Sequence, residues 1–413
     1  MMKILGEPQK SFRTIHIAGT NGKGSTATAL SSILKESGFK VGLFTSPHLI
    51  SFTERIRINN IQITEQNVID LAAKIRGLIE RTSLKPTFFE FVTAMAFYYF
   101  ASEKVDFGII ETGMGGRFDS TNVIEPEISI ITNIGLDHCE FLGDTISDIT
   151  FEKAGIIKPH VPVITASTNP AVLKQLSDIA AERGSEIHIY DRDFKGSLLS
   201  MDDKHLEFDY TGHGIYNNLS LPLSGGYQLF NVCTAIRGSE LLMEKGVSIP
   251  DRAISEGVSK VKLEGRFEYV SENPPIILDG AHNPEATRSL SSSLGDILPG
   301  KEIILIVGVM NDKDIGGIMG PLINSANSII LTKAAYERAA STQIMTETIT
   351  SLYNSGINAA TDISSTETVA EAIDLAKSRC NENAVILITG SFYTTGEAKE
   401  LLGHTGILSR LRE

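Results

Sequence analysis

Short, almost uninterrupted apolar runs alternate along this chain with longer segments of helical periodicity. Continuous apolar runs are typical of parallel strands that helices cover on both faces. The runs predict strands near residues 14–19, 40–45, 105–112, 128–135, 161–167, 274–280, 302–309, 328–333 and 384–391. Segments 25–38 and 65–82 are two of the helices expected between them. The sequence therefore predicts an α/β fold built from strand–helix–strand units.

The alternation of strand and helix breaks once, between about residues 191 and 223. The residues there are polar and strand-like, as in HLEFDY, which favours a small antiparallel insertion. A helix is expected over residues 227–246, and a fresh strand–helix series begins after SKVKLEGRFEYV. A length of 413 residues fits two domains. We expect an N-terminal domain with a phosphate-loop-type, mostly parallel sheet over residues 1–262, and a smaller Rossmann-like α/β domain over residues 263–413.

Composition limits the class of function. The formal net charge of −13 argues against a general affinity for nucleic acid or for an acidic membrane surface. The apolar run near FVTAMAFYYF is too short to span a bilayer, and the N-terminus lacks the apolar core of a signal peptide. Cys139, Cys233 and Cys380 are far apart and lack metal-binding spacing, so buried free thiols are expected. We expect a soluble cytoplasmic protein.

The segment IHIAGTNGKGSTATAL, residues 15–30, carries the strongest chemical signal. It has the pattern of a buried strand, a glycine-rich turn with one lysine, and the start of a helix. Gly19, Gly22 and Gly24 allow successive backbone N–H groups to point at an anion, and the helix adds the positive end of its dipole. Lys23 would reach the β- and γ-phosphates. The segment therefore predicts a nucleotide-binding site.

This loop departs from the standard phosphate-loop pattern at two positions. The pattern has a glycine where this chain has Ile17, and a serine or threonine directly after the lysine where this chain has Gly24. Since Gly24 has no hydroxyl to offer Mg²⁺, a metal ligand must come from another segment.

Acidic and histidine residues follow other predicted strands. Glu111 ends the strand FGIIE, and Asp137 and His138 follow ISIITNIG. Because ligands of open α/β sheets bind beyond the carboxyl ends of the strands, we expect these groups to converge near Lys23. Hard oxygen ligands and one imidazole beside a triphosphate favour Mg²⁺ held partly by the nucleotide.

The loop GTNGKGST resembles the ATP loop of the folylpolyglutamate synthase and dihydrofolate synthase family, within the Mur ligase superfamily. The resemblance continues in family order through FTSPHLISFTERIRIN, TFFEFVTAMAF, ETGMGGRFDSTNVI, TNIGLDH, EKAGIIK, EGRFE, DGAHNP and TGSFYTTGEAK. It implies a monomeric ligase that uses ATP and Mg²⁺ to add L-glutamate to a folate-type carboxylate through an acyl phosphate. The acceptor, dihydropteroate or folylglutamates, stays open; the intact TFFEF and GRFDS segments favour both.

The resemblance also implies nucleotide and metal ligands. ATP is expected to contact Thr20, Asn21, Gly22, Lys23, Gly24, Ser25, Asn231, Arg266 and Asp279. Two Mg²⁺ ions are expected, with ligands Ser46, Glu111, His138 and Lys153, the lysine as a carbamate. Ser46 would supply the hydroxyl that Gly24 lacks, and an unmodified lysine is the alternative for Lys153. Catalysis is expected to depend on Lys23, His138 and Lys153.

The two remaining substrates are assigned by the same resemblance. The folate-type acid is expected against Thr87, Phe88, Phe89, Glu90, Phe118, Asp119 and Ser120. Aromatic faces can stack on a pterin ring, and a carboxylate can accept hydrogen bonds from pterin N–H groups. The alternative is that the phenylalanines of TFFEF are core residues of a helix start. Glutamate is expected near Arg55, His282 and Ser391, with a helix cap as the alternative for His282.

Two other functions are weaker alternatives. A cell-wall amino-acid ligase of the same superfamily usually has a nucleotide-sugar-binding domain before the phosphate loop, and only about a strand and a turn precede Gly19 here. A non-catalytic nucleotide-binding regulator would need the loop without the metal ligands. The presence of all four predicted metal ligands argues against such a regulator.

Overall fold

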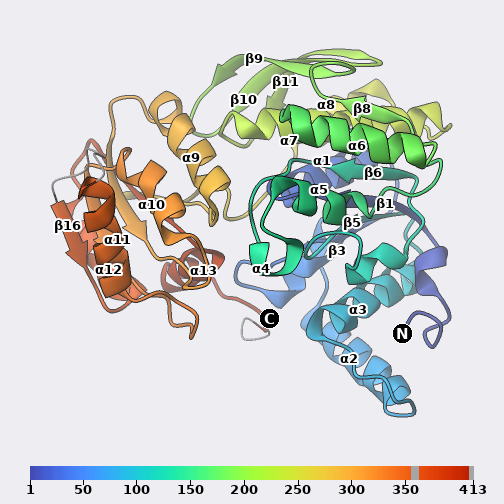
Figure 1. Ribbon diagram of the computed structural model, residues 1–413, viewed down its shortest axis with the longest axis horizontal. Coiled ribbons are helices and arrows are strands. Elements are labelled where there is room, and N and C mark those ends of the chain that lie inside the picture. The colour runs from blue at the N-terminus through green and yellow to red at the C-terminus, as the bar shows by residue number, and fades with distance from the viewer. Residues whose placement is uncertain (355–361, 409–413) are drawn as a thin grey trace.

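Two mostly parallel sheets organise the chain, one in each half (Figure 1). The computed structural model describes residues 1–354 and 362–408. We call residues 1–259 the N-terminal lobe and residues 268–401 the C-terminal lobe. The α/β class predicted from the apolar runs is confirmed, and so is the antiparallel insertion in the first half of the chain.

The sheet of the N-terminal lobe has eight strands among the described residues. They are β1 Arg13–Ala18, β2 Val41–Phe44, β3 Ile56–Ile58, β4 Ile61–Gln62, β5 Phe107–Glu111, β6 Ile128–Ile131, β7 Val163–Thr165 and β8 Ile187–Ile189. Their spatial order is β4-β3-β2-β5-β1-β6-β7-β8. The pairs β2–β3 and β3–β4 are antiparallel, and the other neighbouring strands pair parallel. Because β1 lies between β5 and β6, the carboxyl ends of these three strands lie side by side.

Helices cover both faces of this sheet. They are α1 Lys23–Glu36, α2 Glu65–Ile79, α3 Phe88–Ser102, α4 Cys139–Leu142, α5 Ile146–Ala154, α6 Pro170–Glu182, α7 Tyr227–Glu244 and α8 Asp251–Ser259, with 3₁₀ turns η1 Pro8–Lys10, η2 Phe52–Arg55 and η3 Ser120–Val123. Ile15 and Ile17 of β1 pack with α1 and α7, whereas Ala18 packs with α5 and α6. Successive strand residues face opposite sides, so the apolar run of β1 serves two cores.

The insertion forms its own three-stranded antiparallel sheet. Its strands are β9 Lys195–Met201, β10 Leu206–Thr211 and β11 Ile215–Leu221, in the order β11-β10-β9. This sheet packs beside α7 and α8 on the outside of the N-terminal lobe (Figure 1). The sheet thereby supports α7, which lies against α1, the helix that begins at the phosphate loop.

The C-terminal lobe is a second, smaller α/β unit. Its strands among the described residues are β12 Glu268–Glu272, β13 Pro275–Leu278, β14 Glu302–Val307, β15 Ser328–Leu331, β16 Asp362–Ser365 and β17 Ala384–Thr389, in the order β12-β13-β17-β14-β15-β16. The helices are α9 Pro284–Ile297, α10 Ile315–Ile323, α11 Thr342–Asn354, α12 Val369–Arg379 and α13 Phe392–Leu401. Ile277 faces α9 and its neighbours while Leu278 faces α12 and α13, so this sheet is also covered on both faces.

All the strands predicted from apolar runs are present. The structure also has strands that the sequence did not predict, and they were missed for a common physical reason. The strands β3, β4 and β8 span only two or three residues, and β12 and β16 are partly exposed edge strands of mixed polarity. Such strands lack the long apolar run that marks a central parallel strand. The predicted domain boundary near Lys262 falls in the segment between α8 and β12 and stays a prediction.

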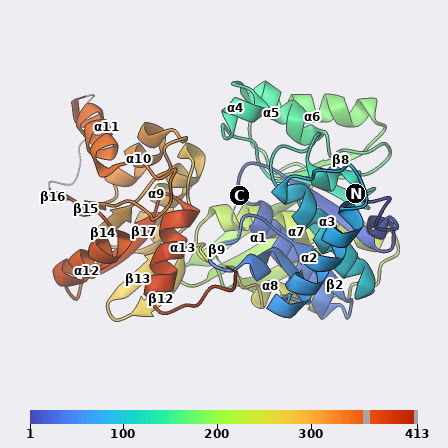
Figure 2. The same ribbon diagram turned by 90° about the horizontal axis from the view of Figure 1, so that it is seen from below.

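The chain passes from the N-terminal lobe to the C-terminal lobe between α8 and β12, and it returns to the N-terminal lobe after α13 (Figure 2). After α13, residues 403–408 pass back to η2 of the N-terminal lobe. Phe52 N donates to Ile407 O at 2.9 Å, and Ile407 N donates to Ser51 Oγ at 2.9 Å. This return segment is thereby bonded to the start of η2, the turn that ends at Arg55.

The expectations about membrane segments and cysteines can be compared with the structure. None of the helices in the described residues is both long and apolar enough to cross a membrane. All three cysteines are free, as expected. The expectation that all are buried was wrong: Cys233 is buried in α7, whereas Cys139 and Cys380 lie at helix ends and are partly exposed.

Acid should destabilise the fold through His16 of β1. Its Nε2 lies 2.8 Å from Thr121 Oγ1, and its Nδ1 is buried without a partner among the described residues. Burial, with a smaller contribution from Lys158, lowers the pKa of His16 to about 3 from an ordinary value of 6.5. Between these values the unfolded chain binds a proton that the folded chain excludes, so stability falls as the pH drops from 6.5 toward 3.

We therefore expect the free energy of unfolding of wild type, relative to that of His16→Gln, to decrease between pH 7 and pH 4.5. Urea unfolding followed by circular dichroism measures it, since the chain has no tryptophan. Parallel pH profiles for wild type and His16→Gln would contradict the assignment.

Candidate active site

The phosphate loop joins the carboxyl end of β1 to α1. Gly22 precedes α1 with φ 84°, and a Cβ there would overlap Asn231 Oδ1 of α7, so both conformation and space require glycine. Lys23 is the first residue of α1, and its Nζ donates to Gly19 O and Thr20 O at 3.1 Å each. These two bonds hold the ammonium group of Lys23 against the backbone of the phosphate loop.

The carboxyl end of β6 fixes the loop from the side. Asn21 N donates to Asn133 Oδ1 at 2.7 Å, and Thr132 Oγ1 donates to Asn21 O at 2.6 Å. The Thr20 hydroxyl also pairs with the backbone of Gly135 at 3.0 Å. With its backbone held on both sides, the loop is preorganised for an anion.

The predicted metal ligands converge on this loop. Glu111 ends β5 with a side chain that is 3% exposed, and its Oε2 accepts a hydrogen bond from Ser46 N at 3.1 Å. Burial raises the pKa of Glu111 to about 7, although Lys23, Arg266 and Arg55 act in the opposite sense. The neighbouring cations do not fully offset the cost of burying the Glu111 carboxylate, so a further cation at this position would be favourable.

Lys153 lies on α5 and reaches the same place from the other side. Its side chain is buried, and Nζ donates to Gly19 O at 2.8 Å. Burial, together with the charge of Lys23, lowers the pKa of Lys153 to about 7. A substantial fraction of this amine is therefore unprotonated at neutral pH, which is an unusual property for a lysine.

The C-terminal lobe contributes the opposite wall. Asp279 directly follows β13, and it accepts hydrogen bonds from Phe267 N at 3.0 Å and Ala281 N at 2.9 Å. Burial raises the pKa of Asp279, while Arg266 opposes the shift. The guanidinium of Arg266 stacks over the ring of Phe392, 4.7 Å from its centroid. A carboxylate and a guanidinium therefore face the phosphate loop from across the cleft.

One cavity of about 460 Å³ lies between the lobes at the phosphate loop. Its lining includes every residue predicted to bind ATP or metal: Thr20, Asn21, Gly22, Lys23, Gly24, Ser25, Ser46, Glu111, His138, Lys153, Asn231, Arg266 and Asp279. Within the described residues there is no cluster of three His, Cys, Asp or Glu side chains that could hold a metal. The predicted ligand set has only two residues of these types, so a metal here would also depend on the hydroxyl, the lysine and the nucleotide.

A second cavity, of about 540 Å³, adjoins the first. Its lining includes most of the predicted acid- and glutamate-binding residues: Arg55, Thr87, Phe89, Glu90, Phe118, Asp119, Ser120, His282 and Ser391. Phe88 is outside this lining and packs on Phe52, with ring centroids 6.4 Å apart. Ser46, His138 and His282 line both cavities. The two cavities therefore meet at the predicted metal ligands.

Several residues of the second cavity also have structural partners. Thr87 and Glu90 form a capping box at the start of α3, and Phe89 stacks on Phe44 with centroids 5.8 Å apart. Asp119 accepts hydrogen bonds from the backbone of Gly113 and Met114 and from Thr121, and the Ser120 hydroxyl lies 2.9 Å from Thr93 Oγ1. These residues shape the cavity wall, while Phe118 remains 81% exposed.

The three residues predicted for glutamate come from three different segments. Arg55 is buried, and its Nε donates to His48 Nδ1 at 2.8 Å. Ser391 caps α13 by accepting from Thr394 N at 3.0 Å. His282 has Nδ1 2.8 Å from Gly280 O, and burial lowers its pKa to about 4 although Asp137 acts in the opposite sense. The helix cap considered for His282 is instead Asn283.

Cations that the sequence interpretation missed also line the second cavity. Lys313 follows β14 and Arg338 follows β15, and both side chains belong to the lining. Arg338 also bonds Tyr393 Oη at 3.2 Å. The rule that ligands lie beyond strand carboxyl ends, which predicted the convergence of Glu111 and His138, could also have indicated Lys313 in the segment MNDKD.

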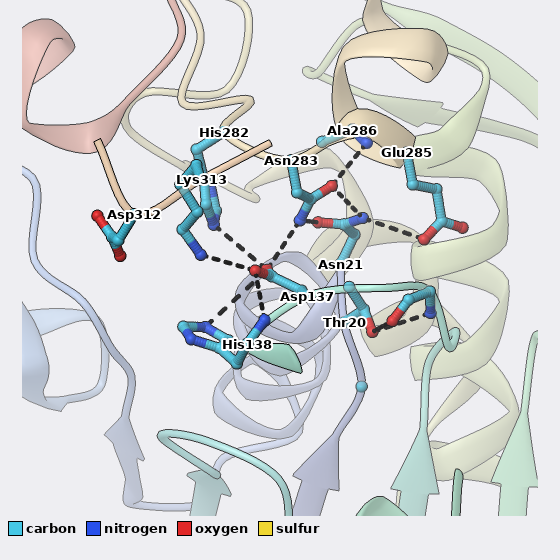
Figure 3. Close-up of polar contacts among 12 residues, drawn as sticks. Thr20, Asn21, Asp137, His138, His282, Asn283, Glu285, Ala286, Asp312 and Lys313 are labelled. Carbon is cyan, nitrogen blue, oxygen red and sulfur yellow. Dashed lines mark hydrogen bonds and ion pairs between the residues drawn. The ribbon is translucent and has the colours of Figure 1, made fainter. Parts of the chain in front are cut away.

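A polar cluster joins the lobes between the two cavities (Figure 3). Asp137, from the loop after β6, accepts from Lys313 Nζ at 2.7 Å and from Asn283 Nδ2 at 3.0 Å. Burial opposes ionisation, but His282, His138 and Lys313 together hold the pKa of Asp137 below its usual value. The predicted convergence of strand-end groups thus extends across both lobes.

Comparison with known proteins agrees with this architecture. Residues 17–237 match the Mur ligase middle domain, and residues 265–392 match the Mur ligase glutamate ligase domain. With the phosphate loop facing a cleft between the two lobes, these matches define an ATP-dependent ligase of the Mur type.

Relatives over nearly the full length specify the family. The chain is 36% identical to the dihydrofolate synthase/folylpolyglutamate synthase of Bacillus subtilis over 97% of this chain and 93% of that protein. The folylpolyglutamate synthase of Mycobacterium tuberculosis complexed with ADP superposes with a TM-score of 0.90 at 30% identity, covering 98% of this chain and 93% of that one. Escherichia coli FolC in complex with DHPP and ADP gives 0.86 at 29% identity, covering 97% and 92%.

The chain belongs to the folylpolyglutamate synthase and dihydrofolate synthase family. The resemblance predicted from the sequence motifs is thereby confirmed, and so is the prediction of an ATP-dependent ligase. The cell-wall ligase and the non-catalytic regulator are not supported by these relatives.

Proposed function

We propose that this enzyme adds L-glutamate to a folate-type carboxylate, with ATP as the phosphoryl donor, and that it accepts both dihydropteroate and folylglutamates. The observation that carries the proposal is the junction of the two cavities at Ser46, His138 and His282. This junction would bring an acid in the second cavity next to the terminal phosphate of ATP in the first. The E. coli relative crystallised with both DHPP and ADP supports the same division.

The chemistry requires two steps. A carboxylate oxygen of the acid attacks the γ-phosphorus of ATP, which gives an acyl phosphate and ADP. The free amine of glutamate then attacks the acyl carbon, loses a proton, and displaces phosphate. Lys23 and the backbone N–H groups of the loop would hold the phosphates in line and neutralise charge that develops on their oxygens.

The residues at the loop fit Mg²⁺. Ser46, Glu111 and His138 would hold one ion, and a carbamate on Lys153 would help to hold a second. The buried carboxylate of Glu111, with its raised pKa, and the hydroxyl of Ser46 are donors of the kind that Mg²⁺ prefers. When bound, the metal would supply charge neutralisation on the transferring phosphoryl group.

Lys153 suits carbamylation. Its buried amine, with a pKa lowered to about 7, is a nucleophile at neutral pH. Attack of Nζ on the carbon of CO₂, with loss of one proton, would convert a cation into an anionic oxygen donor. An unmodified ammonium beside Lys23 would instead repel a metal ion.

Glutamate would enter from the C-terminal lobe. Lys313 and Arg338 present two cations to the second cavity, and Arg55 presents a third from the N-terminal lobe. Such an arrangement suits a dicarboxylate whose amine must remain free to attack. Because residues of one chain line both cavities, we further infer that the enzyme acts as a monomer.

A radiolabelled-glutamate assay tests the proposal. Purified protein receives ATP, Mg²⁺ and labelled glutamate with dihydropteroate, with a tetrahydrofolate, or with no acid. We expect label in a folate product with each acid, and ADP release only when both acid and glutamate are present. Incorporation with neither acid would sink the assignment, and incorporation with only one would restrict the acceptor.

A further inference from the structure

Asn283 of the DGAHNP segment has every hydrogen-bonding position of its side chain in use. Its Oδ1 accepts from Ala286 N at 2.9 Å, which caps α9, and from Asn21 Nδ2 at 3.2 Å. Its Nδ2 donates to Asn21 Oδ1 at 3.0 Å and to Asp137 Oδ2 at 3.0 Å. The residue is 1% exposed. A buried carboxamide with two acceptor bonds and two donor bonds has one defined orientation.

The partner carboxamide belongs to the phosphate loop. Asn21 and Asn283 form a reciprocal pair, in which each Nδ2 donates to the other Oδ1 (Figure 3). The backbone of Asn21 is itself fixed by Asn133 and Thr132 at the end of β6. Asn21 is therefore bonded to the N-terminal lobe through its backbone and to the C-terminal lobe through its side chain.

Asp137 provides a second connection at the same junction. Its Oδ2 accepts from Asn283 and its Oδ1 from Lys313, so it ties the loop after β6 to the segments after β13 and β14. Glu285, on the first turn of α9, accepts from Asn133 Nδ2 at 3.0 Å. The start of α9 is thereby placed against the phosphate loop by several bonds, with Asn283 at their centre.

We propose that Asn283 is a positioning residue that sets the C-terminal lobe against the phosphate loop during the reaction. The inference rests on the proposed function, because the loop would hold the phosphoryl donor while the C-terminal lobe would carry the cations for the amino acid. The Asn21–Asn283 pair fixes the distance between these two parts. Asn283 acts through Asn21 and Asp137 and has no assigned contact with substrate, so its effect should appear in turnover.

The structure offers a variant that separates this role from folding. Asn and Asp are about equally good helix N-caps, so Asn283→Asp keeps the bond to Ala286 N. The new carboxylate loses both Nδ2 donors and faces Asp137 across 3.0 Å. Asn283→Asp should therefore break the two bonds that Asn283 Nδ2 donates across the lobes, to Asn21 and Asp137, while α9 stays capped. Asn21→Ala removes the other half of the pair.

The experiment measures kcat and each KM for wild type, Asn283→Asp, Asn21→Ala and the double variant. A misplacement of about 1 Å can reduce turnover about 10²-fold, so we expect Asn283→Asp to lower kcat about 10- to 100-fold. Its KM for ATP should stay within about threefold of wild type and its melting temperature close to wild type. The double variant should lose less turnover than the product of the two single effects, because both variants break the same Asn21–Asn283 pair, although Asn283 also bonds Asp137 and Asn21 also bonds Glu285.

Three outcomes would overturn the proposal: unchanged kcat in Asn283→Asp, an effect confined to the KM for ATP, or effects that multiply in the double variant. Small-angle scattering adds a readout that does not require turnover. With a non-hydrolysable ATP analogue, Asn283→Asp should have a larger radius of gyration than wild type, and equal values would reject the positioning role. If wild type had no ligase activity, the proposed function would be refuted. The scattering measurement would still test whether Asn283 positions the two lobes.

Discussion

Replacing Lys23 with alanine is expected to lower kcat on the order of 10³-fold, because the lysine supplies the fixed cation beside the terminal phosphates. The fold should survive, since within the part of the chain that the structure describes Lys23 Nζ bonds only the carbonyl oxygens of Gly19 and Thr20 in its own loop. Steady-state turnover with saturating ATP, acid and glutamate measures the loss. Far-UV circular dichroism checks that the variant is folded.

Lys35 provides a matched control for this prediction. It lies in the last turn of the same helix, α1, and is exposed to solvent. Lys35→Ala removes an equal charge from the same element, so its turnover should match wild type. Retained activity in Lys23→Ala would mean that the nucleotide site has been misassigned.

Removing the amine of Lys153 should have an effect of similar size. Lys153→Ala deletes the buried nitrogen that would carry the carbamate, and with it one anionic oxygen donor of the proposed metal site. Since a bound metal ion contributes several kcal/mol to charge stabilisation in the transition state, we expect turnover to fall about 10²- to 10⁴-fold. The same assay at fixed Mg²⁺ concentration measures it.

Chemical rescue separates the carbamate from a role of the ammonium itself. Short carboxylates such as acetate or propionate fit the space that alanine leaves, and they should restore part of the activity of Lys153→Ala. Exposed Lys174 on α6 is the control, and Lys174→Met should neither lose activity nor respond to acetate. Rescue by alkylamines but not by carboxylates would contradict carbamylation.

The fold followed from patterns that are local in the sequence. Continuous apolar runs predicted the central strands because a strand buried on both faces cannot alternate polar and apolar residues. The phosphate loop was also recognisable from a local pattern, since its strand, glycines, lysine and helix start lie within 16 contiguous residues, Ile15 to Leu30. Short edge strands such as β8 and β16 were missed because neighbouring strands, more than their own residues, define them.

The candidate site was predictable where strand ends carry it. Glu111 ends β5, whereas His138 and Asp279 follow β6 and β13, and the parallel strands of each sheet place their carboxyl ends at one edge. The sequence did not show which phenylalanine of TFFEF lines a cavity and which packs in the core. Phe89 lines the second cavity and Phe88 packs on Phe52, because one residue along a helix turns the side chain by about 100°.

The sequence by itself determined the two α/β units, the phosphate loop and the groups gathered at each sheet edge. Only the tertiary structure decided how the two edges face each other. The Asn21–Asn283 pair and the Asp137–Lys313 ion pair join residues 262 and 176 positions apart. No local periodicity encodes such contacts, because they depend on where one folded lobe docks on the other.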